Sequence, residues 1–391
     1  MALFVPAFLL LFLLSLALRV DPFFTVIWFL LGTYGLARMW IRRSVQHLQI
    51  SRRFEDRAFT GDEVDVHLTI RNAGRLPVLW LQIGESLPLE LTTTPFPDQA
   101  ITLGGREVRE FVYRLSCRRR GYYSLGPLRM ETGDLLGIED RVLLANEPRH
   151  LTVYPRIVSL EQLGLPTRSA LVSLPARMPL FEDTSRIMGV RDYQPGDSPR
   201  RIHWTATART GALVVKQYQP AIARETLICL DLDWRDYTMR RHEATEQAIV
   251  VAASVANHSI VRDGLPAGLA TEATDPLVGD RRRIVLPPRS GRAQLMAILE
   301  VLARVQPATG VRFVDLLREE SVHLPWGTTL LLITGSIDDA LAETVLYLRR
   351  RGHATAVVLV QEASGSGGAP GSLAGIPVYR VWNDADLAVW Q

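Results

Sequence analysis

The sequence predicts a multi-domain chain with an N-terminal transmembrane α-hairpin, an all-β sandwich and a doubly wound α/β domain. Uncharged apolar runs open the chain, alternating strand patterns follow, and strand and helix patterns then alternate to the end. At 391 residues the chain is too long for one ordinary domain, and 47% hydrophobic residues make it too apolar for disorder. The predicted boundaries are 1–42 for the hairpin, 48–155 for the sandwich, 156–221 for a linker with a motif and 222–391 for the α/β domain.

The hairpin is predicted from two uncharged runs, Ala2 to Leu18 and Pro22 to Ala37. Each is near the lower limit for crossing about 30 Å of hydrocarbon as a helix, and the link between them is too short for parallel spans. The arginines after the second run predict that the C-terminal bulk is cytoplasmic, in a protein of the plasma (inner) membrane with two spans. A secretory signal peptide followed by a buried helix is disfavoured, because no Lys or Arg precedes the first run.

Charge and cysteine content exclude several classes of protein. The 44 basic and 41 acidic residues give a net charge of +3. A dedicated nucleic-acid-binding protein usually has a larger excess of basic residues, so this class is disfavoured. Cys117 and Cys229 are the only cysteines, so a disulfide framework or a cysteine zinc site is excluded. We expect both to be buried thiols.

The sandwich is predicted from strand patterns. Residues 60–72, TGDEVDVHLTIRN, alternate apolar and polar positions between turn signals. Similar runs follow at Leu79–Ile83, Glu107–Cys117 and Leu151–Tyr154. They predict a small antiparallel, Ig-like sandwich that serves as a spacer or interaction module.

Residues 189–219, GVRDYQPGDSPRRIHWTATARTGALVVKQYQ, hold the most informative motif. Pro195-Gly196 predicts a type II turn, because proline fixes φ and glycine accepts a positive φ. Ser198 before Pro199 predicts the start of a short helix that runs to Arg209 and ends at Gly211. A strand is predicted from Ala212 to Gln219.

This motif resembles the signature of the bacterial and archaeal family called domain of unknown function 58. His203 stands where that family usually has Asp, and Pro220-Ala221 replaces acidic residues. One interpretation makes the charged members an anion-binding or partner-recognition site; the other makes them ion pairs that lock the turn. We favour the lock, because structural ion pairs are commoner than sites, and we predict no catalytic residue. The matching positions are Arg191, Asp192, Tyr193, Pro195, Gly196, Asp197, Arg200, Arg201, Ile202, Trp204, Ala208 and Arg209.

The C-terminal domain is predicted from a strand at Thr226–Asp231, a helix at Arg240–Arg262 and a further alternation of strands and helices. Strands are expected at Gly268–Thr271, Ile284–Leu286, Thr329–Thr334, Ala354–Val360 and Val378–Val381, and helices at Arg292–Val305, Phe313–Glu319 and Asp338–Arg351.

This order, with acidic residues after the first strand, resembles a von Willebrand factor A domain. Such domains hold a hard cation with an Asp-x-Ser-x-Ser loop, a Thr and a further Asp. Here Asp231 is kept, Asp233 and Arg235 replace the serines, and Gly335 after Thr334 stands where the later Asp is expected. The loop at Asp231, Asp233 and Thr334 is therefore degenerate. We predict no metal and no cofactor, with Arg235 paired to Asp231 or Asp233 instead.

The leading functional hypothesis is a membrane-anchored, non-catalytic adaptor that presents its von Willebrand A-like domain in the cytoplasm. The family resemblance implies an AAA+ ATPase of the MoxR type as the partner. One alternative is a hydrolase-type enzyme that uses Asp197 and His203, and another is a metal-dependent adhesion-type binding protein. No nucleic-acid partner is expected.

Overall fold

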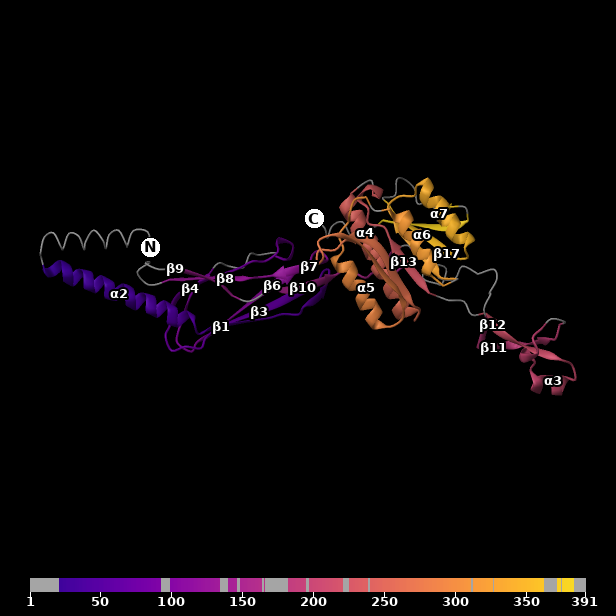
Figure 1. Ribbon diagram of the computed structural model, residues 1–391, viewed down its shortest axis with the longest axis horizontal. Helices are drawn as coiled ribbons and strands as arrows, with labels where there is room; N and C mark the ends of the chain where they lie inside the picture. The colour runs from indigo at the N-terminus through magenta and orange to yellow at the C-terminus, as the bar shows by residue number, and fades with distance from the viewer. Residues whose placement is uncertain are drawn as a thin grey trace. The chain divides into compact units, whose positions relative to one another are not determined.

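The computed structural model divides the chain into two units, Met1–Pro155 and Arg156–Gln391 (Figure 1). It describes residues 21–92, 99–133, 140–145, 148–163, 165, 182–194, 197–220, 225–237, 240–310, 312–325, 327–361, 371–373 and 375–382.

The first unit begins with helix α2, Asp21–Val45. Its C-terminal part is attached to the β-rich part of the unit, because the Trp40 indole donates a hydrogen bond to the Pro77 carbonyl at 3.1 Å and Ile41 is buried. Within the described ranges, no helix combines the length and apolarity needed to cross a membrane. The uncharged part of α2, Pro22 to Ala37, extends about 24 Å at 1.5 Å per residue, short of the ~30 Å of a hydrocarbon core.

The prediction of a two-span protein of the inner membrane is therefore wrong. It accepted uncharged runs near the lower limit of span length, and the run within α2, which ends before Arg38, is too short. The first predicted span, residues 2–18, lies outside the described residues.

Beyond α2, the described part of this unit contains three small sheets and a 3-10 turn at Leu89–Leu91. The first has the antiparallel order β1–β3–β6, the second the order β2–β10–β7 with β2 and β10 parallel, and the third the antiparallel order β5–β4–β8–β9. The strands are β1 (Leu48–Arg53), β2 (Arg57–Phe59), β3 (Glu63–Asn72), β4 (Val78–Glu85), β5 (Gln99–Leu103), β6 (Val108–Ser116), β7 (Gly121–Leu125), β8 (Leu128–Gly133), β9 (Asp140–Ala145) and β10 (Arg149–Tyr154).

Strand β3 links the two apolar cores of this unit. Its alternating apolar side chains are buried as the sequence pattern predicts. Val64 and Val66 belong to one core and Leu68 and Ile70 to the other. An Ig-like assignment of this unit stays a prediction.

The second unit contains a seven-stranded sheet of order β15–β14–β13–β16–β17–β19–β18. Five strands are parallel, and the edge strands β15 and β18 are antiparallel. The strands are β13 (Thr226–Leu230), β14 (Ala267–Thr274), β15 (Arg281–Arg289), β16 (Thr329–Thr334), β17 (Ala354–Val360), β18 (Gly371–Leu373) and β19 (Ile376–Val381).

Helices cover both faces of this sheet (Figure 1). Helices α4 (Arg241–Asn257) and α5 (Arg292–Arg304) lie on one face, and α6 (Phe313–His323) and α7 (Asp339–Arg350) on the other. Leu227 and Cys229 of β13 pack in the core beneath α6 and α7. Because strand side chains alternate, Ile228 and Leu230 face the other layer, which explains why the whole of β13 is apolar and buried. Both cysteines are buried and unpaired, which confirms the prediction.

A separate hairpin precedes this sheet in the chain. Strands β11 (Glu182–Asp192) and β12 (Val214–Pro220) pair antiparallel, and the short helix α3 (Trp204–Thr210) lies between them in sequence. The predicted helix from Pro199 is split into a 3-10 turn at Pro199–Arg201 and α3. Gly211 ends α3 in the left-handed region at φ 71°, as expected. Pro195 and Gly196 lie outside the described residues, so the type II turn stays a prediction.

Candidate functional site

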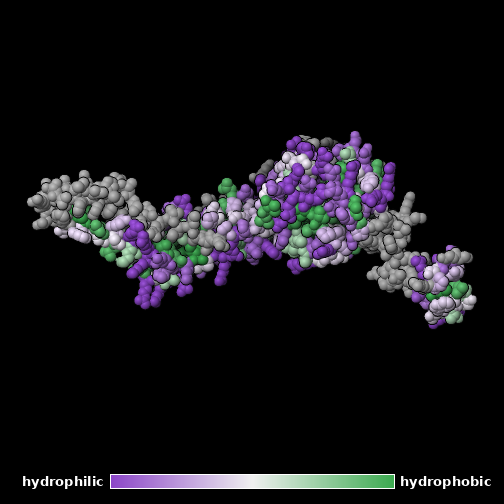
Figure 2. Space-filling model, in the orientation of Figure 1, coloured by the Kyte–Doolittle hydropathy of each residue, from purple (hydrophilic) through white to green (hydrophobic). Residues whose placement is uncertain are grey.

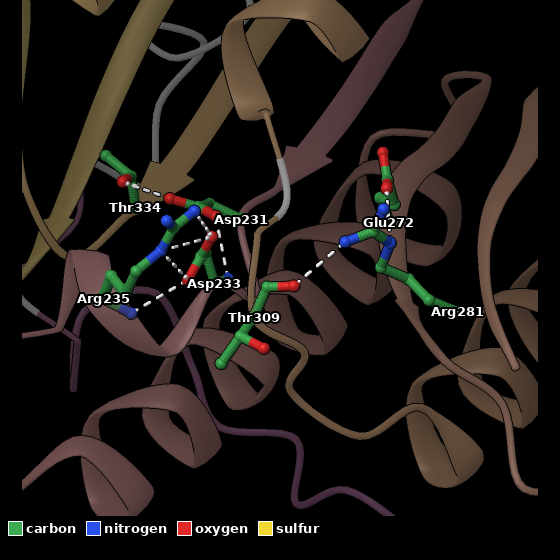
Figure 3. A network of polar contacts seen from close by, with 7 residues as sticks. All are labelled: Asp231, Asp233, Arg235, Glu272, Arg281, Thr309 and Thr334. Atoms are coloured by element: carbon green, nitrogen blue, oxygen red, sulfur yellow. Dashed lines mark hydrogen bonds and ion pairs between the residues drawn. The ribbon is translucent and has the colours of Figure 1, made fainter.

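The carboxyl ends of β13 and β16 form the candidate site. These neighbouring parallel strands end side by side, which brings Asp231 and Asp233 next to Thr334 (Figure 3). The carboxyl end of a parallel sheet is the usual place for a ligand in α/β folds.

Asp231 is buried at the base of the site. Its carboxyl group accepts hydrogen bonds from the Thr334 hydroxyl at 2.8 Å and from the Asp233 backbone N–H at 3.0 Å. Burial raises the pKa of Asp231 well above its ordinary range, and the neighbouring Asp236 raises it further. Burial also raises the pKa of Asp236, which hydrogen-bonds to Asp231. Burial and the neighbouring carboxyl group therefore favour the protonated form of Asp231.

Asp233 is neutralised by Arg235. The Arg235 guanidinium donates to both Asp233 oxygens, at 2.7 Å from Nη2 and 3.1 Å from Nε, and its backbone N–H donates at 3.0 Å (Figure 3). The Asp233 side chain is 1% exposed and that of Arg235 is 63% exposed. Arg235 therefore closes the loop from the solvent side, in one of the two pairings that the sequence allowed.

Tyr237 fills the space between the two strand ends. Its hydroxyl donates to the Asp231 backbone oxygen at 2.7 Å, and its side chain is buried. A Cβ atom on Gly335 would lie 2.5 Å from Tyr237 Cδ1 and 2.6 Å from the Asp236 backbone oxygen. The position where a von Willebrand A cation site has Asp therefore has no room for any side chain.

A neighbouring loop completes the support of the site. The Trp234 N–H donates to the Ala308 carbonyl at 3.1 Å, and Arg281 donates to the Thr309 carbonyl at 2.9 Å while pairing with Glu272 at 3.1 Å (Figure 3). The 3-10 turn Trp234–Asp236 is thus held between two parts of the same domain.

These residues do not fit the cation that the resemblance implies. Burial favours the protonated form of one carboxyl group, the second carboxyl group is paired with arginine, and the third position has no room for a side chain. Within the described part of the chain, no group of three or more His, Cys, Asp or Glu is placed to hold a metal ion. The absence of a metal nevertheless stays a prediction.

A cleft of about 490 Å³ opens beside the strand ends. Asp231, Asp236 and Ser336 contribute polar groups, whereas Phe313 and Leu341 contribute apolar surface from α6 and α7. Asp338, also at the cleft, caps α7 by accepting from the Leu341 N–H at 2.7 Å. Such a cleft can accept a protein side chain of mixed polarity. The remaining lining residues are Arg235, Arg312, Val314, Asp315, Thr334 and Ala340.

Two charged residues of the signature motif, Arg191 and Asp197, form an ion pair. Arg191 donates two hydrogen bonds to Asp197, at 2.8 and 2.7 Å, and the Gln194 N–H donates to Asp197 at 2.9 Å. The bonds from Arg191 are the main cause of a lowered pKa at Asp197. The lock interpretation requires such an ion pair, and the lock itself stays a prediction.

His203 caps α3. Its Nδ1 accepts from the Ala206 N–H at 3.2 Å. Asp, the usual residue of the family here, is among the best N-cap residues, which gives the substitution a physical reason. Asp197 and His203, the pair required by the hydrolase hypothesis, therefore serve two separate local structures.

The other motif residues remain at the surface or partly covered. Trp204 is 67% exposed, and Arg209 and Asp192 are exposed as well. Tyr193 and Arg201 are half-buried, and the side chain of Arg200 is not described. Sequence reasoning missed Asp236 and Tyr237, whose signal was an acidic and an aromatic residue directly after the degenerate loop.

These features define an α/β domain with a closed strand-end site and a preceding signature hairpin. Residues 189–366, which include parts of both, match the family described as "Protein of unknown function DUF58". The Bacillus subtilis protein described as "Uncharacterized protein YeaD" is 25% identical over 266 residues, which cover 63% of this chain and 62% of that protein. This chain therefore matches less than two thirds of that relative.

Solved structures give only weak likenesses. The CARDB domain of a Pyrococcus furiosus protein, in complex with di-metal ions, is 14% identical over 27% of this chain and 91% of that chain, with a TM-score of 0.20. The C-terminal domain of Wzt is 11% identical over 28% of this chain and 75% of that chain, with a TM-score of 0.21. TM-scores this low carry no argument about fold or function.

Proposed function

We propose that this chain is a non-catalytic adaptor whose α/β domain, of the von Willebrand A-like type, presents a binding surface to a protein partner. The resemblance points to an AAA+ ATPase of the MoxR type as that partner. The observation that carries the proposal is the closed strand-end site, where Arg235 neutralises Asp233 and Tyr237 occupies the space next to Gly335.

The chemistry of the site supports binding over catalysis. A catalytic carboxylate needs to be accessible and charged, whereas Asp231 is buried and its pKa is raised by that burial. Asp197 and His203 are engaged in a lock and a helix cap. The cleft beside the strand ends nevertheless offers polar and apolar groups to an incoming side chain.

The strand order supports the domain type. Numbered along the domain, the first five strands have the order 3-2-1-4-5, with strand 3 antiparallel at the edge. This is the order of doubly wound folds, which bind ligands at the carboxyl ends of their strands.

Direct binding tests the proposal. The purified chain is immobilised, and the MoxR-type ATPase of the same genome is supplied with ATP and with hydrolysis blocked. We expect saturable binding with a Kd of about 10 μM or tighter, the range of specific transient complexes. If no nucleotide state of the ATPase binds, the partner assignment is wrong.

A further inference from the structure

The hairpin that carries the signature motif buries very little of its own surface. We call β11, α3, β12 and the chain between them, residues 182–220, the signature module. Among its described side chains only Val214 and Val215 are buried, and α3 buries none. Yet Trp204 is 67% exposed, Val190 48% and Leu213 47%. An isolated two-stranded hairpin is marginally stable in water, so this exposed apolar surface needs an explanation other than packing within the module.

The exposed tryptophan stands on a fixed support. The His203 N–H donates to the Val214 carbonyl at 2.9 Å, and the Val214 N–H donates to the Thr207 hydroxyl at 3.2 Å. These bonds hold both ends of the first turn of α3 against β12. The bidentate Arg191–Asp197 pair fixes the chain before the helix. A rigid aromatic side chain loses little conformational entropy on binding, which is why such residues act as interface anchors.

The module carries a small excess of positive charge. Residues 182–220 contain six basic and four acidic residues, and one of the acidic residues, Asp197, accepts from Arg191. Arg209 is exposed at the end of α3. Figure 2 shows hydrophobic surface on the module bordered by hydrophilic surface. Trp and Arg are the residue types enriched among interface hot spots.

We propose that the signature module is a docking surface for an acidic face of a protein partner, with Trp204 entering an apolar pocket and Arg209 pairing with a carboxylate. This inference rests on the adaptor function proposed above and names the part of the chain that makes the contact. A protein is favoured over nucleic acid because the positive charge is confined to a few side chains around one aromatic residue, and the whole chain has a net charge of only +3.

The test compares four variants of the full chain for binding to the same hydrolysis-blocked ATPase at physiological salt. W204A removes the anchor and R209E reverses the neighbouring charge. The matched controls are W28A, which removes a tryptophan that is 71% exposed in the other unit, and R318E, which reverses an exposed arginine on α6. Because Trp204 and Arg209 are exposed, the circular dichroism and melting temperature of all four should match those of the wild type.

We expect W204A to weaken binding by about 30-fold, the loss typical of a hot-spot residue. R209E should weaken it by about tenfold and reduce its dependence on salt. The controls should bind like the wild type. If the ATPase binds the wild type and all four variants equally, the assignment of the docking surface to the signature module is wrong, while the adaptor proposal stands. If it does not bind the wild type, the proposed partner and the docking surface fall together.

Two further probes address other ligands at the same surface. A labelled single-stranded 30-mer DNA and vesicles containing phosphatidylserine are added to the wild type and to W204A. We expect neither probe to bind in a Trp204-dependent way. Trp204-dependent binding of either one, without an effect of W204A on the ATPase, overturns the assignment to a protein partner.

Discussion

Replacing Gly335 by alanine tests whether steric fit closes the strand-end site. The added Cβ would lie 2.5 Å from Tyr237 Cδ1, about 1 Å inside ordinary carbon–carbon contact. The Tyr237 ring cannot easily move, because it is 1% exposed and its hydroxyl is bound to the Asp231 carbonyl at 2.7 Å. The second obstacle, the Asp236 oxygen at 2.6 Å, belongs to the backbone.

The expected cost of G335A lies at the upper end of the range for overpacking, about 3 kcal/mol. For a domain of this size, that loss lowers the Tm by about 6–12 °C. Differential scanning calorimetry of the full chain measures it. The control is G189A, since a Cβ at Gly189 meets no atom within 4 Å and should leave the Tm unchanged. A G335A protein that melts within about 1 °C of the wild type would refute the steric argument.

Four further changes follow from the structure. Burial raises the pKa of Asp231, so the folded chain keeps a proton that the unfolded chain releases at about pH 4. The free energy of unfolding should therefore fall as the pH rises from about 4 through the raised pKa of the folded chain. D231N should remove this slope from urea midpoints, and an unchanged slope would contradict the raised pKa of Asp231. G335D should destabilise the chain more than G335A and gain nothing from Mg²⁺ in a melting assay; stabilisation by Mg²⁺ would show that the cation site is functional. R52L leaves buried Glu85 without the arginine that pairs with it, at a cost of about 3–5 kcal/mol in chemical unfolding, whereas R53L at the exposed neighbour should cost little. H203A removes the cap of α3, at about 1 kcal/mol, and should speed hydrogen exchange at the Ala206 amide, whereas H203D should retain protection; equal exchange in both would exclude the capping role.

Local patterns predicted the strands of the α/β domain other than β18, but only β3, β4, β6 and β10 among the strands of the first unit. The alternation in β3 predicts burial on one face, and the unbroken apolar run of β13 predicts burial on both faces, as the structure shows. The end of α3 at Gly211 followed from the one residue that accepts a positive φ without cost. Strand alternation and helix ends depend on residues that are close together in the sequence, so they can be predicted from it.

The N-terminal helix shows where composition misleads. Hydropathy counts apolar residues but does not report what covers them. In the structure Trp40 binds Pro77 and Ile41 is buried in the same unit, so part of the apolar surface of α2 serves packing. Trp204 is the opposite case, because helical spacing places it on a face with Ala208 but does not say whether that face meets water.

The sequence by itself determined the strands of the α/β domain other than β18, the end of α3 at Gly211, the buried thiols and the departures from the cation motif at Asp233, Arg235 and Gly335. Only the tertiary structure decided how those departures are accommodated. The register of β13 against β16 joins Asp231 to Thr334, residues far apart in the chain, and places Tyr237 against Gly335. The buried carboxyl group, the closed ion pair and the lack of room for a Cβ at Gly335 depend on distances between such residues, and the order of residues along the chain does not contain those distances.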